Sequence, residues 1–243
     1  ENAYGEEMVN FARDFSMMTL DSQEAQTLVT YLETNDTEDN TSLGTVTIKS
    51  SFSQLTWAGL KMQLAGEMQV TLKELDGIMG EIQVQYNLNR ESEDGVTETY
   101  NVTDYYTVKY NTQRLYLMDF KRNTTQVFDG GRELYSGRRI LLGVGNDDAV
   151  KVKSSTDRRY LAYTFNKDLW SYDQTDGKAV KVFSFRTRED VSGRSAYDQH
   201  DIQIVSVRDS GDIDFLVYGY MNRGSHEGEC GLAFYRYRRP DNA

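Results

Sequence analysis

The sequence contains very little cysteine and proline. Its single cysteine, Cys230, cannot form an intramolecular disulfide, which excludes a cystine-stapled secreted scaffold but does not separate a cytosolic protein from an exported bacterial one. A single proline, Pro240, accompanies 17 tyrosines and 10 phenylalanines. Because aromatic side chains favour the half-buried surfaces of pleated sheets, this composition favours a β-rich class.

Long apolar runs and an excess of positive charge are also absent. No stretch approaches the roughly 18–20 apolar residues that span a bilayer, so we expect no direct membrane insertion by this chain. The net charge of −11 repels phosphate backbones, which argues against nucleic-acid binding. The first residue is Glu1 and no signal pattern follows it, so we expect a processed or trimmed piece of a larger protein.

The length and composition predict a folded chain of two domains. The 243 residues exceed the usual size of one domain, and 38% hydrophobic with 27% charged residues is typical of globular proteins. A polar turn at residues 90–95 suggests the division. We predict an α+β domain over residues 1–98 and a β-rich region over residues 99–243.

The first 32 residues show helical spacing, and a polar stretch follows them. Apolar residues three and four apart predict a helix over residues 8–15. Asp21, with Glu24 three residues later, predicts the start of a second helix. Its apolar stripe is Ala25, Leu28, Val29 and Leu32. Residues 33–42 hold no apolar side chain and predict an exposed loop.

From residue 45 the apolar period becomes two. The alternation begins at residues 45–49 and is clearest at residues 82–88, which predicts strands with one solvated face. The apolar residues between 55 and 64 fit either a short helix or another strand.

The rest of the chain contains an internal repeat of strand candidates. Residues 105–110, 115–119 and 126–128 form the first copy, and residues 160–163, 169–173 and 180–183 form the second. In a looser third copy, residues 202–205 match 150–152, residues 215–218 match the strand at 160, and residues 232–235 match the strand at 169. A period of about 40–55 residues with several short strands in each unit is typical of propeller blades.

One repeat also resembles a known family. Residues 154–163 combine a serine and aspartate turn with a strand ending in Tyr163, residues 168–173 begin with aspartate, leucine and tryptophan, and residues 175–178 form a threonine and glycine turn. This stretch resembles one blade of a TolB-like or prolyl-oligopeptidase-type β-propeller. Residues 215–237 resemble segments of uncharacterised, membrane-anchored surface proteins of Gram-positive bacteria, which implies an extracytoplasmic location and no known activity.

A propeller closes only with about four or more blades, whereas residues 99–243 supply at most three. We therefore expect a partial or open propeller that continues beyond Ala243, with a β-sandwich as the alternative. Exposed blade edges predict self-association.

The motifs tested for catalysis give no site. A serine hydrolase of the α/β-hydrolase type needs a Gly-x-Ser-x-Gly turn, and none occurs. Gly143 and Gly145 begin like a nucleotide loop but lack the third glycine and a P-loop lysine. The acid pairs Glu6-Glu7 and Asp147-Asp148 show no feature that selects them as a general acid and base.

Two short clusters contain residue types that bind metal ions. His226, Glu227 and Cys230 supply at most three zinc ligands, so a hairpin loop is favoured. Residues 209–214 hold three aspartates without the spacing of a calcium loop, which favours a β-turn. We predict no catalytic, cofactor-binding or metal-binding residues and no cofactor.

Besides an autonomous structural domain without a ligand, two hypotheses about function follow. The preferred one is a non-enzymatic protein-interaction or sensory module of a larger protein, anchored in the cell envelope through segments absent from this chain. The alternative is a carbohydrate-binding or carbohydrate-active protein, because tyrosines, Trp57 and Trp170 offer faces on which sugars stack. For the two tryptophans, packing in a core is favoured over sugar binding.

Overall fold

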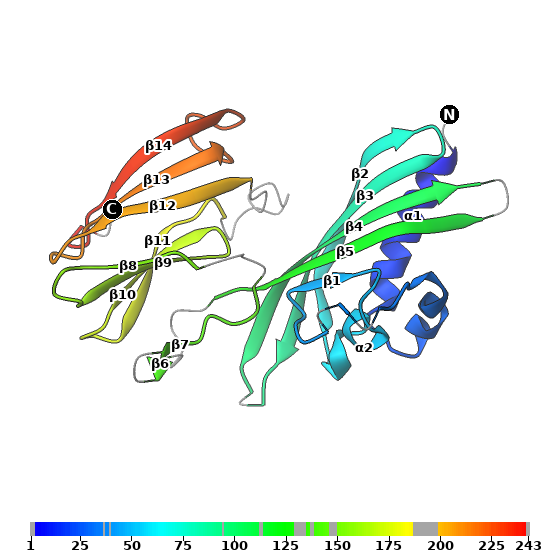
Figure 1. Ribbon diagram of the computed structural model, residues 1–243, viewed down its shortest axis with the longest axis horizontal. Coiled ribbons are helices and arrows are strands. Elements are labelled where there is room, and N and C mark those ends of the chain that lie inside the picture. The colour runs from blue at the N-terminus through cyan, green and yellow to red at the C-terminus, as the bar shows by residue number, and fades with distance from the viewer. Residues whose placement is uncertain are drawn as a thin grey trace. The chain divides into compact units, whose positions relative to one another are not determined.

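The computed structural model describes residues 3–35, 37–38, 40–93, 95–111, 114–128, 135–136, 139–145, 150–186 and 199–241. The chain is mainly antiparallel β and divides into two compact units (Figure 1). Unit 1 comprises Glu1–Val127 with Gly143–Asn146, and unit 2 comprises Phe128–Leu142 with Asp147–Ala243. No helix in the described ranges is both long enough and apolar enough to cross a bilayer.

Unit 1 begins with the predicted helix, α1 (Ala3–Met18), which packs against one face of a sheet. Its apolar spacing places Met8, Ala12 and Phe15 on one buried stripe. The Phe15 ring contacts the rings of Tyr106 and Phe120, at centroid distances of 5.6 and 5.4 Å. The helix is therefore held by aromatic contacts to the sheet.

The second helix forms as a 3₁₀-helix, η1 (Glu24–Tyr31). Its N-cap is Gln23, so the predicted cap Asp21 lies two residues earlier, where its Oδ1 accepts the backbone N–H of Gln23 at 2.7 Å. A 3₁₀-helix has three residues per turn, so Ala25 and Leu28 align on one buried side. Val29, one residue off that line, is 45% exposed, which corrects the predicted α-helical stripe.

The ambiguous stretch between residues 55 and 64 contains two helical turns followed by a strand. The elements are α2 (Phe52–Leu55), η2 (Trp57–Gly59) and β2 (Gln63–Asp76). Trp57 and Ala58 adopt left-handed backbone angles, with φ of 63° and 53°. Non-glycine residues rarely adopt this conformation, and here it turns the buried Trp57 side chain into the core.

The sheet of unit 1 has five antiparallel strands in the order β1-β5-β4-β3-β2. Its other members are β1 (Thr45–Thr47), β3 (Met79–Glu91), β4 (Thr97–Tyr110) and β5 (Leu115–Gln126). The predicted alternation is confirmed in β3, where Ile82, Val84, Tyr86 and Leu88 are buried.

The predicted domain boundary at residue 98 falls inside β4, which is hydrogen-bonded to both β3 and β5. The first copy of the predicted repeat also lies in this sheet, because residues 105–110 belong to β4 and residues 115–119 to β5. Its short apolar strands are therefore parts of long strands that pack under α1.

Unit 2 contains two larger sheets that match the second and third predicted copies. The four-stranded sheet, in the order β11-β10-β9-β8, consists of β8 (Val152–Ser154), β9 (Tyr160–Phe165), β10 (Asp168–Asp173) and β11 (Lys178–Phe183). The three-stranded sheet consists of β12 (His200–Val207), β13 (Ile213–Tyr220) and β14 (Cys230–Tyr237). A short pair, β6 (Tyr135–Ser136) with β7 (Arg139–Ile140), precedes them.

The two larger sheets of unit 2 share one apolar core. Ala162 and Leu169 of the four-stranded sheet are buried together with Ile202, Phe215 and Val217 of the three-stranded sheet. None of the described sheets closes on itself. The predicted mainly β class is thus confirmed, with open antiparallel sheets.

Candidate functional site

The cluster around Cys230 lies in the exposed loop between β13 and β14. His226 Nδ1 lies 3.2 Å from the Glu229 carboxylate, and both side chains are 69% exposed. Cys230 is exposed at the start of β14. Within the described ranges, no three histidine, cysteine, aspartate or glutamate side chains come together as a metal site.

The aspartate-rich segment 209–214 forms the turn between β12 and β13, as predicted. Its three carboxylates make separate contacts. Asp209 accepts the backbone N–H of Asp157 at 3.1 Å, and Asp212 accepts that of Arg239 at 3.2 Å. Gly211 adopts a φ of +86° at the tip. These two carboxylates fix neighbouring turns, whereas Asp214 on β13 binds Arg236, so the three do not converge on one point.

The remaining sequence candidates do not assemble a reaction site. The backbone N–H of Val144 donates to Gln126 Oε1 at 3.2 Å, so the glycine-rich segment packs on the end of β5. Asp147 and Asp148 lie outside the described residues. Trp57 and Trp170 are 1% and 6% exposed, which confirms the prediction that both pack in cores.

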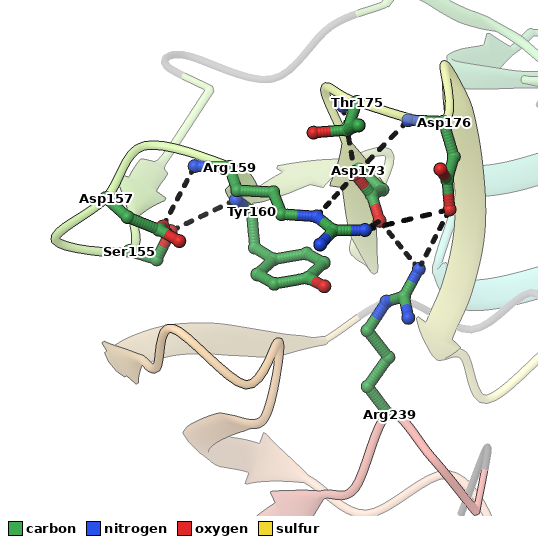
Figure 2. A network of polar contacts seen from close by, with 8 residues as sticks. All are labelled: Ser155, Asp157, Arg159, Tyr160, Asp173, Thr175, Asp176 and Arg239. Carbon is green, nitrogen blue, oxygen red and sulfur yellow. Dashed lines mark hydrogen bonds and ion pairs between the residues drawn. The ribbon is translucent and has the colours of Figure 1, made fainter.

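A network of polar contacts in unit 2 is centred on Asp173, at the end of β10 (Figure 2). Its carboxylate accepts two hydrogen bonds from Arg159 and one, at 2.7 Å, from Arg239. Both guanidinium groups lie against the ring of Tyr160, at 5.0 and 4.9 Å from its centroid. Arg239 follows β14, so this network ties the end of the chain's last described strand to the four-stranded sheet.

The hydrogen bonds of this network lower the pKa of the Asp173 carboxylate. Burial raises the pKa of Asp173, but the hydrogen bonds from Arg159 and from the backbone of Thr175 and Asp176 outweigh it and lower the pKa. The carboxylate is 3% exposed and holds arginines on two sides. A carboxylate with a lowered pKa is ionised near neutral pH and has no proton to transfer. Its hydrogen bonds to the arginines and to the turn backbone therefore give it a structural role.

A second carboxylate, Asp214 on β13, lies on the outer face of the three-stranded sheet. It binds Arg236, Arg208 and Ser206. The hydrogen bond from Arg236 is the main cause that lowers the pKa of Asp214 to about 2. This cluster forms a charged border beside a group of apolar side chains.

That apolar group is exposed on the surface of unit 2, and we name it the outer patch. It consists of Leu216, Tyr218, Leu232 and Phe234. Leu232 is 67% exposed, Phe234 56% and Tyr218 38%. The four residues pair across two strands, Leu216 with Phe234 and Tyr218 with Leu232. Apolar side chains thus gather on the sheet face opposite the core.

The four-stranded sheet carries the equivalent group at the equivalent positions, which we name the covered patch. It consists of Leu161, Tyr163, Trp170 and Tyr172. Leu161 pairs with Tyr172, and Tyr163 with Trp170, in the same register as the outer patch. Phe128, Ile140 and Leu142 pack on this face, and the Phe128 ring lies 4.7 Å from that of Trp170. One face of the repeat is thus covered within the chain, and its equivalent is exposed.

Unit 1 holds a buried charged cluster that sequence reasoning missed. Arg122 and Asp104 are directly opposite on β5 and β4 and form a two-pronged ion pair, at 2.8 and 2.9 Å, with both side chains 0% exposed. Tyr86 and Ser16 also donate to Asp104, at 3.0 and 2.8 Å. Burial would lower the pKa of Arg122, but Asp104 raises it above its ordinary value. The cluster is closed to solvent, so we expect it to stabilise the fold and not to bind a ligand.

The opposite face of the same sheet is polar and accessible. Its central rows pair Gln83 with Tyr105 and Lys121, and Gln85 with Thr103 and Asn123. These side chains are half-buried or exposed, and Tyr105 is 42% exposed. The face offers amides, hydroxyls and one aromatic ring.

No protein-family profile matches the chain, and no curated protein or solved structure is significantly similar to it.

Proposed function

We propose that this chain is a non-enzymatic protein-interaction module that works outside the cytoplasmic membrane as part of a larger envelope protein. The observation that carries the proposal is the outer patch, because its equivalent in the preceding repeat is covered by apolar side chains of the chain itself. In this proposal the two sheets of unit 2 are successive blades. The resemblance of residues 154–178 to TolB-like blades supports that architecture, and the resemblance of residues 215–237 to Gram-positive surface proteins supports the location.

The physical argument rests on the cost of leaving the outer patch in water. Full burial of a leucine or phenylalanine side chain contributes roughly 1.5–3 kcal/mol. Leu232 and Phe234 are the most exposed members of the outer patch. The charged border of Asp214, Arg208 and Arg236 surrounds one end of it, as polar rims surround the apolar centres of protein interfaces.

The test is an affinity capture from a detergent extract of the source's envelope, with identification by mass spectrometry and titration of the captured protein. We expect a saturable protein partner whose affinity falls at least tenfold, or about 1.4 kcal/mol, in Leu232→Lys. Val152→Lys is the matched control, because Val152 is also an exposed apolar residue on a strand of unit 2, at 57%. Equal affinity of both variants, or hydrolytic turnover by the purified chain, would contradict the proposal.

The polar face of unit 1 favours the alternative of carbohydrate binding. Amides and hydroxyls in register can bond to sugar hydroxyls, and the exposed Tyr105 ring can stack on a sugar face. If this function holds, a glycan array gives a saturable ligand, Tyr105→Ala loses most of the binding, and Tyr105→Phe retains it. An array without ligands removes this alternative.

A further inference from the structure

The strand β14 lies at the edge of its sheet. Within the described ranges it pairs only with β13, whereas its equivalent β10 is paired on both sides, with β9 and β11. The Met221 N–H donates to the Glu229 carbonyl at 2.8 Å, so the backbone N–H and C=O groups of the odd-numbered residues of β14 point toward β13. Leu232 and Phe234 therefore present their N–H and C=O groups to the open side.

The centre of this edge lacks the features that protect edge strands from pairing. Such strands are usually short, or carry proline or inward-pointing charges. β14 spans eight residues without proline. Its charged residue, Arg236, lies near one end and is bound to Asp214 of β13, and the exposed side chains at the centre are apolar. Leu232 and Phe234 are exposed on one face and Tyr235, at 40%, on the other.

The charges that flank β14 change sign along the strand. Glu227 and Glu229 precede it, and the exposed Arg238 follows it, whereas Arg239 is bound to Asp173 within the chain. Two identical strands that pair in antiparallel orientation place the acidic end of each beside the basic end of the other. Opposite charges then flank the pair at both ends, which selects a second copy of this chain as the partner.

We propose that two copies associate through β14, which pairs with itself in antiparallel orientation about Ala233. This register places Leu232 of each copy opposite Phe234 of the other, and it brings the exposed Arg238 of each copy to the Glu229 end of the other. Centring the pair on Phe234 would instead place Leu232 opposite Arg236, which leaves Leu232 without an apolar cross-strand partner.

The result is a continuous six-stranded sheet in which the two outer patches lie side by side. The inference rests on the proposed interaction function and deepens it, because dimerisation doubles the apolar surface offered to an envelope partner. It also satisfies the backbone groups of the open edge, which is how strand addition gains affinity.

The chain's single cysteine allows the register to be measured without substitution. Cys230 is exposed and accepts a nitroxide spin label. In the Ala233-centred pair the two Cys230 backbones are six residues apart, or about 20 Å at 3.4 Å per residue. We expect electron–electron double resonance to give a distance near this value, and light scattering to show a dimer. A distance of about 27 Å, as centring on Phe234 requires, or a strict monomer at about 1 mM, would overturn the proposal.

Variants separate pairing from misfolding. Leu232→Lys should yield a monomer with an unchanged circular dichroism spectrum, because the side chain is exposed, and Val152→Lys should remain dimeric. A persistent Leu232→Lys dimer would overturn the proposal. Failure of the inference is distinguishable from failure of the proposed function: a monomeric wild-type chain that still captures an envelope protein removes only the dimer, and a dimer that captures nothing removes only the function.

Discussion

Replacement of Asp104 by asparagine is expected to lower the free energy of unfolding of unit 1 by about 3–5 kcal/mol. The carboxylate is the ionic partner of the fully buried Arg122, and no water reaches either side chain to replace it. Arg122 would keep its hydrogen bonds to the Leu55 carbonyl and to Thr19, at 3.0 Å each, but its charge would be buried without compensation. The cost is therefore much larger than that of a lost surface pair.

Tryptophan fluorescence measures this loss in unit 1 directly. The chain has two tryptophans, and Trp57 lies beside Arg122, with the guanidinium carbon 4.4 Å from the centre of its ring. In a Trp170→Phe background, the fluorescence of Trp57 during urea unfolding reports unit 1. The urea midpoint should fall with little change in slope.

The matched control is Asp14→Asn, which removes the carboxylate of the exposed Arg13–Asp14 pair on α1. Exposed pairs contribute about 0–1 kcal/mol, so this variant should unfold close to the wild type. Combining Asp104→Leu with Arg122→Met removes both charges and should recover part of the stability. A loss below 1 kcal/mol in Asp104→Asn would contradict the assignment of this pair as an anchor of the fold.

The sequence predicted the strands well because burial alternates along them. In β3 every second residue from Ile82 to Leu88 is buried, so the period of two is visible without a structure. A pattern of alternating burial does not reveal the buried charged pair. Asp104 and Arg122 occupy inward positions of their strands, yet charged residues are almost never fully buried unless paired, and only the strand register shows that these two are opposite each other.

The first copy of the predicted repeat does not form a sheet of its own, for a similar reason. The second and third copies correspond to real sheets, whereas the first lies in the long strands β4 and β5 of unit 1. Short windows of alternating aromatic and apolar residues look alike in a blade and in a sheet under a helix. Contacts such as that between Asp173 and Arg239 span 66 residues, so local patterns carry no sign of them.

Replacement of Trp170 by alanine is expected to lower the free energy of unfolding of unit 2 by about 3–5 kcal/mol, because it empties the centre of the covered patch. The ring is 6% exposed and meets Phe128 edge-on, at an interplanar angle of 85°. Hydrogen exchange of β9 and β10 amides, followed by mass spectrometry, measures the loss within unit 2. Trp170→Phe retains most of the apolar contact and should cost less.

Leu232 provides a sharper comparison, because it occupies the position in β14 that Trp170 occupies in β10. Its side chain is 67% exposed, so Leu232→Ala should change the stability of the monomer by no more than about 0.5 kcal/mol. If Trp170→Ala also costs less than 1 kcal/mol, the covered patch is not an interior contact, and the argument from its exposed equivalent fails with it. If the two variants differ as expected, one position of the repeat stabilises the fold in one sheet and remains available for binding in the other.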